Sequence, residues 1–320
     1  MKKAFIGLAI LGVLIVAYTV LDGFLFDGVR AQKINEQGFQ ANYFAHDTLS
    51  NQACVVLIGG GQWGDYWASE FARRGYAAFS LPYAGAEGLP ALPEEIELAY
   101  FEKALNWLAN QAAVNADKIV LMGASRNAEL SLVLASRFPE LVGGVIAYAP
   151  SAVSWSNTVL PYNSDEVKAS WTYQGEAIPY ISKEKLQGGE SAMLNTLTYW
   201  SEGLADSSAV ANAFIPIEKV KGPVLLLSGK DDKVWPAAQM ADMLEARSKA
   251  LSFAYPFENI QYENAGHLIS TNPNQKEGPR EGNMDIKGKS YSFEFGGTAE
   301  GDYQAKQDAI QRVWRFLEAL

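Results

Sequence analysis

From about Gly38 to the carboxyl terminus, short apolar runs alternate with longer segments in which apolar side chains recur every three or four positions. The short runs match buried strands, and the longer segments match amphipathic helices. This alternation predicts an α/β fold with a mostly parallel central sheet and helices on both faces. We expect strands at 54–59, 76–82, 118–122, 142–149 and 223–227, and helices at 66–74, 94–110, 125–137, 236–249 and 303–320.

The amino-terminal pattern is different. Two lysines, Lys2 and Lys3, precede residues 4–21, which carry no charge and are rich in Leu, Ile, Val and Ala. About 18 residues at ~1.5 Å each make roughly 27 Å of helix, just enough to cross the apolar core of a bilayer. The apolar run is longer than that of a signal peptide, and Ala17-Tyr18-Thr19 is a poor cleavage site. We therefore expect an uncleaved membrane anchor.

The anchor sets the expected organisation and location. Residues 1–21 are the anchor or a signal segment, residues 22–50 a linker with a leading strand, and residues 51–320 one α/β domain. The two lysines favour a cytoplasmic amino terminus, which would place the domain in the periplasm or otherwise outside the cytoplasm, whereas Arg30 and Lys33 after the apolar stretch favour the reverse orientation. Secretion after signal cleavage is the alternative.

Residues 150–222 interrupt the alternation. They would form an insertion after the sixth strand, and they hold several large aromatic residues among many Ser, Asn and Gly. Insertions at that point of an open sheet lie over the carboxyl ends of the strands, where ligands bind. We expect a cap that lines a pocket. The alternative is an insertion that packs on the domain and has no role in binding. The aromatic residues include Trp155, Trp171, Tyr173, Tyr180, Tyr199 and Trp200.

Composition excludes several classes of function. The chain is 48% hydrophobic, which is enough for a large core and rules out a disordered protein. Its net charge of −10 would repel a polyanion, so we expect no nucleic-acid partner. Cys54 is the only cysteine and lies in an apolar run, which favours a buried core thiol over a nucleophile. No cluster of potential ligands suggests a metal, and we expect no cofactor.

The candidate nucleophile is Ser125, between the predicted strand at 118–122 and the following helix. A sharp turn there would lift the serine hydroxyl above the sheet edge, with the helix amino terminus beneath it. The Arg126 backbone N–H and the helix dipole could then stabilise an oxyanion. Gly-x-Ser alone is a weak signal, because serine often caps helices. The strand–turn–helix context is typical of the nucleophile elbow of α/β-hydrolases.

A serine nucleophile needs a base and an acid. His267 follows a β-like segment and precedes the last helix, which is where an α/β-hydrolase places its base, whereas His46 lies early and reads as a surface or edge histidine. The acid should follow the penultimate strand, where Asp231 and Asp232 are adjacent. We prefer Asp232. In this interpretation His267 accepts the Ser125 proton and Asp232 orients the imidazole.

The second oxyanion donor is expected in the loop after the strand at 54–59, which reads Gly59-Gly60-Gly61-Gln62. Glycine lets backbone N–H groups approach a substrate closely, so the Gly61 or Gln62 amide is the candidate. A tight turn without a catalytic role is the alternative. The loop lacks the Lys-Ser/Thr of a P-loop, so it does not suggest a nucleotide site.

Several segments together resemble the catalytic domain of the acyl-CoA thioesterase / bile acid-CoA:amino acid N-acyltransferase family, a dienelactone-hydrolase-like fold. The resemblance covers about residues 54–320 and implies a Ser/Asp/His or Cys/Asp/His triad acting on activated acyl groups. Here those positions are Ser125, Asp232 and His267, and the serine resembles the hydrolase branch. The similar segments are Gly60-Gly61, Tyr66-Trp67-Ala68-Ser69, residues 98–107, Ala128-Glu129-Leu130, residues 171–176, residues 214–218, residues 228–235 and Ala265-Gly266-His267.

Two features depart from that family. The family has an immunoglobulin-like domain before the hydrolase domain, whereas here only the apolar stretch and about 30 residues precede it. The elbow reads Gly-x-Ser-x-Asn, with Asn127 where the family usually has glycine. An extra side chain there should crowd the helix against the strand, so we expect Asn127→Gly to raise kcat. Recruitment of Asn127 into the site is the alternative.

We therefore expect hydrolysis of acyl thioesters or carboxylic esters through an acyl-Ser125 intermediate. An acyl-CoA thioesterase-like activity is what the resemblance implies, although a domain outside the cytoplasm would not meet cytosolic acyl-CoA. The alternatives are an N-acyltransferase that moves the acyl group to an amine, and a membrane-tethered acyl-binding protein without turnover.

Overall fold

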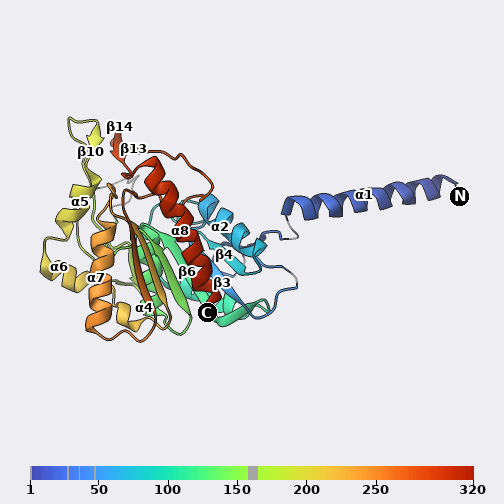
Figure 1. The fold of residues 1–320 in the computed structure, drawn as a ribbon, viewed down its shortest axis with the longest axis horizontal. Coiled ribbons are helices and arrows are strands. Elements are labelled where there is room, and N and C mark those ends of the chain that lie inside the picture. The colour runs from blue at the N-terminus through green and yellow to red at the C-terminus, as the bar shows by residue number, and fades with distance from the viewer. Residues whose placement is uncertain (1, 27–28, 36, 47, 158–164) are drawn as a thin grey trace.

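The computed structural model describes residues 2–26, 29–35, 37–46, 48–157 and 165–320. An eight-stranded sheet in the order β1-β2-β4-β3-β6-β7-β11-β12 forms the centre (Figure 1). β1 and β2 pair antiparallel with each other, β2 pairs antiparallel with β4, and the remaining pairs are parallel. The predicted α/β-hydrolase fold class is confirmed. The strands are β1 (Gln32–Ile34), β2 (Ala41–Phe44), β3 (Gln52–Ile58), β4 (Ala77–Leu81), β6 (Val114–Ala124), β7 (Gly144–Tyr148), β11 (Val224–Gly229) and β12 (Phe257–Tyr262).

Helices cover both faces of this sheet because its inner strands are apolar on both sides. In β3, Val56 packs into one core with α3 (Ala99–Ala109), α4 (Arg126–Arg137) and α7 (Ala237–Ala250). The next residue, Leu57, packs into a second core with α2 (Gly61–Arg73) and α8 (Ala299–Glu318). Successive side chains of a strand point to opposite faces, which divides the apolar residues between the two cores.

One predicted helix begins later than expected. The helical pattern at 94–110 becomes β5 (Ile96–Glu97) followed by α3. The backbone amide of Ile96 donates to Ser170 and that of Leu98 to Thr172, and β5 pairs with β8 (Trp171–Tyr173). Pairing with a segment 75 positions away in sequence, Ile96 with Trp171, therefore overrides the local helical pattern.

The insertion after β7, the sixth strand of the main sheet in chain order, contains small elements of its own. These are β8, β9 (Glu176–Ala177), β10 (Met193–Leu194), α5 (Thr196–Gly203), α6 (Ser207–Ala213) and the short helix η1 (Ile217–Lys219). The stretch 158–164 of this insertion lies outside the described residues.

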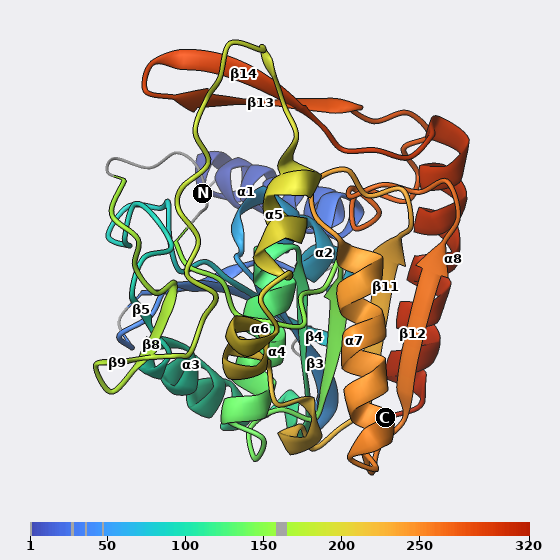
Figure 2. The same ribbon diagram turned by 90° about the vertical axis from the view of Figure 1, so that its left-hand side faces the viewer.

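A hairpin between β12 and α8 was not predicted. It consists of β13 (Glu281–Ile286) and β14 (Lys289–Glu294), and it lies at the end of the molecule toward which β11 and β12 point (Figure 2). β14 also pairs with β10 of the insertion. A small apolar core of Leu194, Ile286 and Tyr291 joins the hairpin to the insertion above the carboxyl ends of the strands.

The amino-terminal segment forms α1 (Lys2–Phe26), which extends away from the body of the molecule (Figure 1). Its apolar side chains at Ile10, Val13 and Val16 are exposed. In the part of the chain that the structure describes, no helix is both long and apolar enough to cross a membrane. Within the region predicted as a linker and leading strand, β1 and β2 belong to the central sheet.

Candidate active site

Ser125 occupies the turn between β6 and α4, as the sequence predicted. Its backbone has φ 59° and ψ −125°, a conformation that is rare and strained for a residue other than glycine. The Ser125 amide donates to the Tyr148 carbonyl of β7 at 2.9 Å, which holds the turn in place. At Gly123 a Cβ atom would lie 2.2 Å from the Asn127 carbonyl oxygen. The close approach of α4 to β6 therefore falls on Gly123.

The structure brings His267 and Asp232 together at the same sheet edge. His267 Nδ1 lies 2.7 Å from Asp232 Oδ2; the Asp232 side chain is buried and that of His267 is largely buried. The other Asp232 oxygen accepts the Val234 and Trp235 amides at 2.8 and 3.2 Å, which fixes the carboxylate plane. Since Nδ1 is engaged with the carboxylate, Nε2 is the nitrogen that can accept a proton from a nucleophile.

Register places Ser125 at the edge that carries this pair. Ala124 of β6 is level with Tyr148 of β7, and Tyr148 is level with Leu227 of β11. The carboxyl ends of these parallel strands therefore line one edge, from which the loops bearing Ser125, Asp232 and His267 emerge. Among the described residues no hydrogen bond joins the Ser125 hydroxyl to His267. Such contacts are often long before substrate binds.

Asp231, the alternative acid, has different partners. Its carboxylate lies 2.6 Å from Lys233 Nζ and also accepts the Gly297 amide at 3.0 Å. The Lys233 hydrogen bond lowers the pKa of Asp231. The two adjacent aspartates thus have separate environments, and Asp232 is the one in contact with the histidine.

Residues 295–297 join the acid loop to the histidine loop. The Phe295 carbonyl accepts the His267 amide at 2.9 Å, and Gly296 forms an antiparallel bridge with Asp232. A Cβ atom on Gly296 would lie 1.8 Å from the Asp231 carbonyl oxygen, so no side chain can be accommodated. Sequence reasoning missed this segment, although the Gly296-Gly297 pair just before the last helix was a visible signal.

The glycine loop after β3 lies beside the nucleophile turn. β3 pairs with β6, and Leu57 is level with Met122, so Gly59 emerges next to the Ser125 turn. α2 begins at Gly61, with Gly60 as its cap at φ 54°. The first amides of any helix lack a carbonyl one turn back. The amides of Gly61 and Gln62 in α2, and that of Arg126 in α4, have this property and remain the candidate oxyanion donors.

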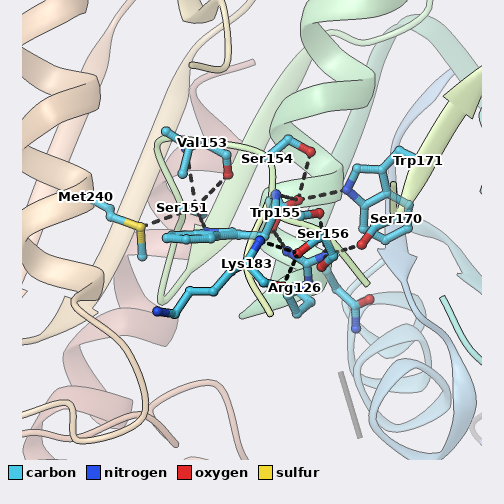
Figure 3. A network of polar contacts seen from close by, with 12 residues as sticks. Arg126, Ser151, Val153, Ser154, Trp155, Ser156, Ser170, Trp171, Lys183 and Met240 are labelled. Carbon is cyan, nitrogen blue, oxygen red and sulfur yellow. Dashed lines mark hydrogen bonds and ion pairs between the residues drawn. The ribbon is translucent and has the colours of Figure 1, made fainter. Parts of the chain in front are cut away.

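A buried polar network connects the nucleophile helix to the insertion (Figure 3). Glu129 is fully buried and forms an ion pair with Arg126 on the preceding turn. One carboxylate oxygen also accepts Trp171 Nε1 at 2.8 Å and the Trp155 amide at 3.2 Å. The second Arg126 amino group donates to the carbonyls of Trp155 and Ser156, both at 3.3 Å.

This network anchors the root of the insertion to α4. Burial raises the pKa of Glu129, and the Arg126 guanidinium opposes that shift. Removing one partner of such a pair leaves the other charge buried and unpaired, which typically costs about 3–5 kcal/mol. Sequence reasoning gave Arg126 only a backbone role and gave Glu129 no role. The signal was a charged residue inside an otherwise apolar helical run.

The other predicted residues lie elsewhere. His46 hydrogen-bonds to the Thr48 hydroxyl at 2.8 Å, and it follows β2, whose last residue, Phe44, pairs with Ala78 near the start of β4. This places His46 at the sheet edge opposite Ser125. Cys54 is fully buried, and burial raises the pKa of its thiol. No cluster of three potential metal ligands occurs among the described residues.

The insertion lines a half-open cleft of about 780 Å³ against the carboxyl-terminal half of α4. Its lining includes Val133 of α4 together with Ser154, Ile178 and Phe214 of the insertion. Ser125, Asp232 and His267 are not among the lining residues. The predicted role of the insertion as the lining of an acyl pocket thus stays a prediction.

A mostly parallel sheet, a serine on a strained strand–turn–helix junction and a His–Asp pair at the same edge are the features of an α/β-hydrolase fold. Two solved structures support this fold. Their sequence identities to this chain are low, so the likeness concerns the fold alone. One is described as a dienelactone hydrolase from Klebsiella pneumoniae, with a TM-score of 0.54 and 12% identity over 91% of this chain and 99% of that one. The other is a dienelactone hydrolase-like promiscuous phosphotriesterase from metagenomic libraries, with a TM-score of 0.51 and 12% identity over 92% of this chain and 99% of that one.

The chain belongs to the family described as BAAT / acyl-CoA thioester hydrolase C terminal, whose profile matches residues 96–320. It is similar to mouse (Mus musculus) mitochondrial acyl-coenzyme A thioesterase 2, with 29% identity over 77% of this chain and 51% of that protein. It is also similar to human (Homo sapiens) acyl-coenzyme A thioesterase 6, with 26% identity over 92% of this chain and 66% of that protein. The chain spans about half the length of the mouse relative.

Proposed function

We propose that the protein hydrolyses acyl thioesters or carboxylic esters through an acyl-enzyme intermediate on Ser125. The observation that carries this proposal is the 2.7 Å contact between His267 Nδ1 and Asp232 Oδ2 at the sheet edge that bears the strained Ser125 turn. A buried carboxylate on Nδ1 fixes the imidazole tautomer and leaves Nε2 free to act as the base.

In the proposed reaction, Ser125 Oγ attacks the acyl carbon while its proton passes to His267 Nε2. The backbone amides of Arg126 and of Gly61 or Gln62 would donate hydrogen bonds to the carbonyl oxygen as it gains negative charge. Collapse of the tetrahedral intermediate expels the thiolate or alkoxide, which takes the proton from His267. Water then gives a proton to His267 and attacks the acyl-serine, which releases the carboxylic acid and restores the serine.

The relatives support the proposed substrate class. The named relatives are acyl-coenzyme A thioesterases, so an acyl-CoA thioester is the first substrate to test. The triad requires only a polarised acyl carbonyl, so a lipid or other carboxylic ester would serve the same chemistry. Serine at position 125 favours water as the acceptor, according to the resemblance to the hydrolase branch.

The direct test of this function is labelling with a fluorophosphonate followed by peptide mapping. We expect a single adduct on the peptide that contains Ser125, and a burst of leaving group from a chromogenic ester because the acyl-enzyme accumulates. Product analysis with added glycine or taurine separates a hydrolase from an N-acyltransferase. A protein that binds acyl esters but gives neither adduct nor burst would contradict the proposal.

A second proposal concerns location: residues 4–21 tether the protein to a membrane. The support is the uncharged apolar sequence of this stretch and the exposure of Ile10, Val13 and Val16 in α1. The full-length protein should sediment with membranes and resist a high-salt wash, because apolar burial rather than charge would hold it there. Deleting residues 2–26, which spares the buried Val29, should release a folded domain. Full-length protein found only in the soluble fraction would refute the tether.

A further inference from the structure

The Asn127 side chain has a partner and a place of its own. The Tyr83 hydroxyl donates a hydrogen bond to Asn127 Oδ1 at 2.7 Å. On the loop after β3, a Cβ atom at Gly59 would lie 2.3 Å from Asn127 Nδ2 and 2.7 Å from Asn127 Cγ. The amide group thus packs directly against the backbone of Gly59. The expected crowding does not arise, because the missing side chain of Gly59 makes room for that of Asn127.

Tyr83 is a rigid donor for this bond. It follows β4, it is buried, and its ring packs edge-on against Phe101 of α3 and Trp171 of β8, with centroids 5.5 and 5.6 Å away. Burial raises the pKa of the Tyr83 hydroxyl, so this group stays protonated and remains a donor. The hydrogen bond costs little side-chain entropy, because the aromatic contacts already restrict the Tyr83 ring.

Asn127 stands between the two sources of candidate oxyanion donors. It directly follows Arg126 in the first turn of α4, and it touches Gly59, two residues before Gly61 where α2 begins. The distance between the first turns of these two helices decides whether their amides can point at one oxygen atom. Oxyanion stabilisation depends on donors held about 2.7–3.1 Å from that atom.

We propose that Asn127 and Tyr83 form a positioning pair that sets the separation of the two halves of the oxyanion hole. The inference rests on the proposed hydrolase function and goes beyond it, because it assigns roles to Asn127 and Tyr83, to which the proposed reaction gives none. Asn127 is a spacer: its amide fills the gap over Gly59, and the Tyr83 hydroxyl fixes the rotation of that amide.

The proposal predicts a specific kinetic signature for Tyr83→Phe, which removes a single oxygen atom. We expect kcat to fall about tenfold with KM unchanged within twofold, because misplaced donors weaken only the transition state. The rate of fluorophosphonate labelling of Ser125 should fall by a similar factor, since phosphonylation uses the same donors. Asn127→Ala and Asn127→Gly should show the same split between kcat and KM.

A double-mutant cycle completes the test. Tyr83→Phe combined with Asn127→Ala should be no slower than Asn127→Ala alone, because the hydroxyl acts only through the amide. Tyr262→Phe is the matched control, since it also removes one tyrosine hydroxyl, whose bond goes to Asp308 at 3.0 Å, and should leave kcat unchanged. Melting curves establish that each variant is folded at the assay temperature.

The outcomes separate the inference from the function on which it rests. Normal turnover and labelling in folded Tyr83→Phe and Asn127→Ala, in a protein that Ser125→Ala inactivates, would overturn the positioning role and leave the hydrolase assignment intact. Fully additive effects of the two substitutions would also overturn it. If the natural sequence itself gives no burst and no adduct, the function is wrong and the inference falls with it.

Discussion

Replacing Ser125 with alanine is expected to lower kcat by on the order of 10⁴–10⁶, with the fold retained. The loss is large because no other group on the strained turn can attack the substrate, and His267 and Asp232 then have no nucleophile to activate. The backbone at φ 59° is equally strained with alanine, so stability should change little. The change in kcat is measured by steady-state kinetics on a chromogenic ester and on an acyl-CoA. Denaturant unfolding measures the stability of the variant.

Ser136→Ala is a matched control for this result. Ser136 lies in α4, the helix that follows Ser125, and is buried; its hydroxyl donates a hydrogen bond to the Val133 carbonyl at 2.9 Å. It should keep activity within about twofold of the natural protein, because a lost local hydrogen bond costs only about 1 kcal/mol of stability. Activity within tenfold of the natural protein in Ser125→Ala would remove Ser125 from the mechanism.

The second large effect is expected at the acid. Asp232→Asn should reduce kcat by about 10³–10⁴, because an amide at this position can hold the histidine in the wrong tautomer and cannot stabilise an imidazolium. The Asp232 carboxylate is held by the 2.7 Å bond to His267 Nδ1 and by two amide donors on its other oxygen. Replacing one of these oxygens with an amide nitrogen therefore disturbs the contact with the histidine.

Asp231→Asn provides the comparison within the same loop. The Asp231 carboxylate pairs with Lys233, which is partly exposed, so its loss should change kcat less than tenfold. Kinetics of both variants at one pH rank the two aspartates. A larger loss for Asp231→Asn would transfer the acid role to that residue.

The contacts of Asn127 reverse the effect expected from the elbow sequence alone. Sequence reasoning placed the close approach of helix and strand at position 127, so glycine there should have raised kcat. The structure puts that approach at Gly123, where a Cβ atom would lie 2.2 Å from the Asn127 carbonyl oxygen, and gives the Asn127 side chain the space over Gly59. Asn127→Gly would empty that space and free the loop, so a lower kcat is now expected.

The sequence by itself determined the fold class and the chain order of the candidate site. The alternation of apolar runs and amphipathic segments is a local signal, and in the structure it corresponds to β3, β4, β6, β7 and β11 with their helices. The serine turn was visible for the same reason, because a strand, a small-residue turn and a helix follow one another directly. Chain order within the fold then indicated Asp232 and His267, whose catalytic roles stay predictions.

Only the tertiary structure decided how distant segments meet. Asp231 and Asp232 are adjacent in sequence, and their environments diverge because Lys233 pairs with the Asp231 carboxylate while His267 contacts that of Asp232. The hairpin of β13 and β14 gains its apolar core by packing on the insertion, where β14 pairs with β10. Asn127 meets Gly59 across more than sixty positions. Local patterns report which face of an element is buried, whereas the partner that buries it is set by contacts that no short stretch of sequence contains.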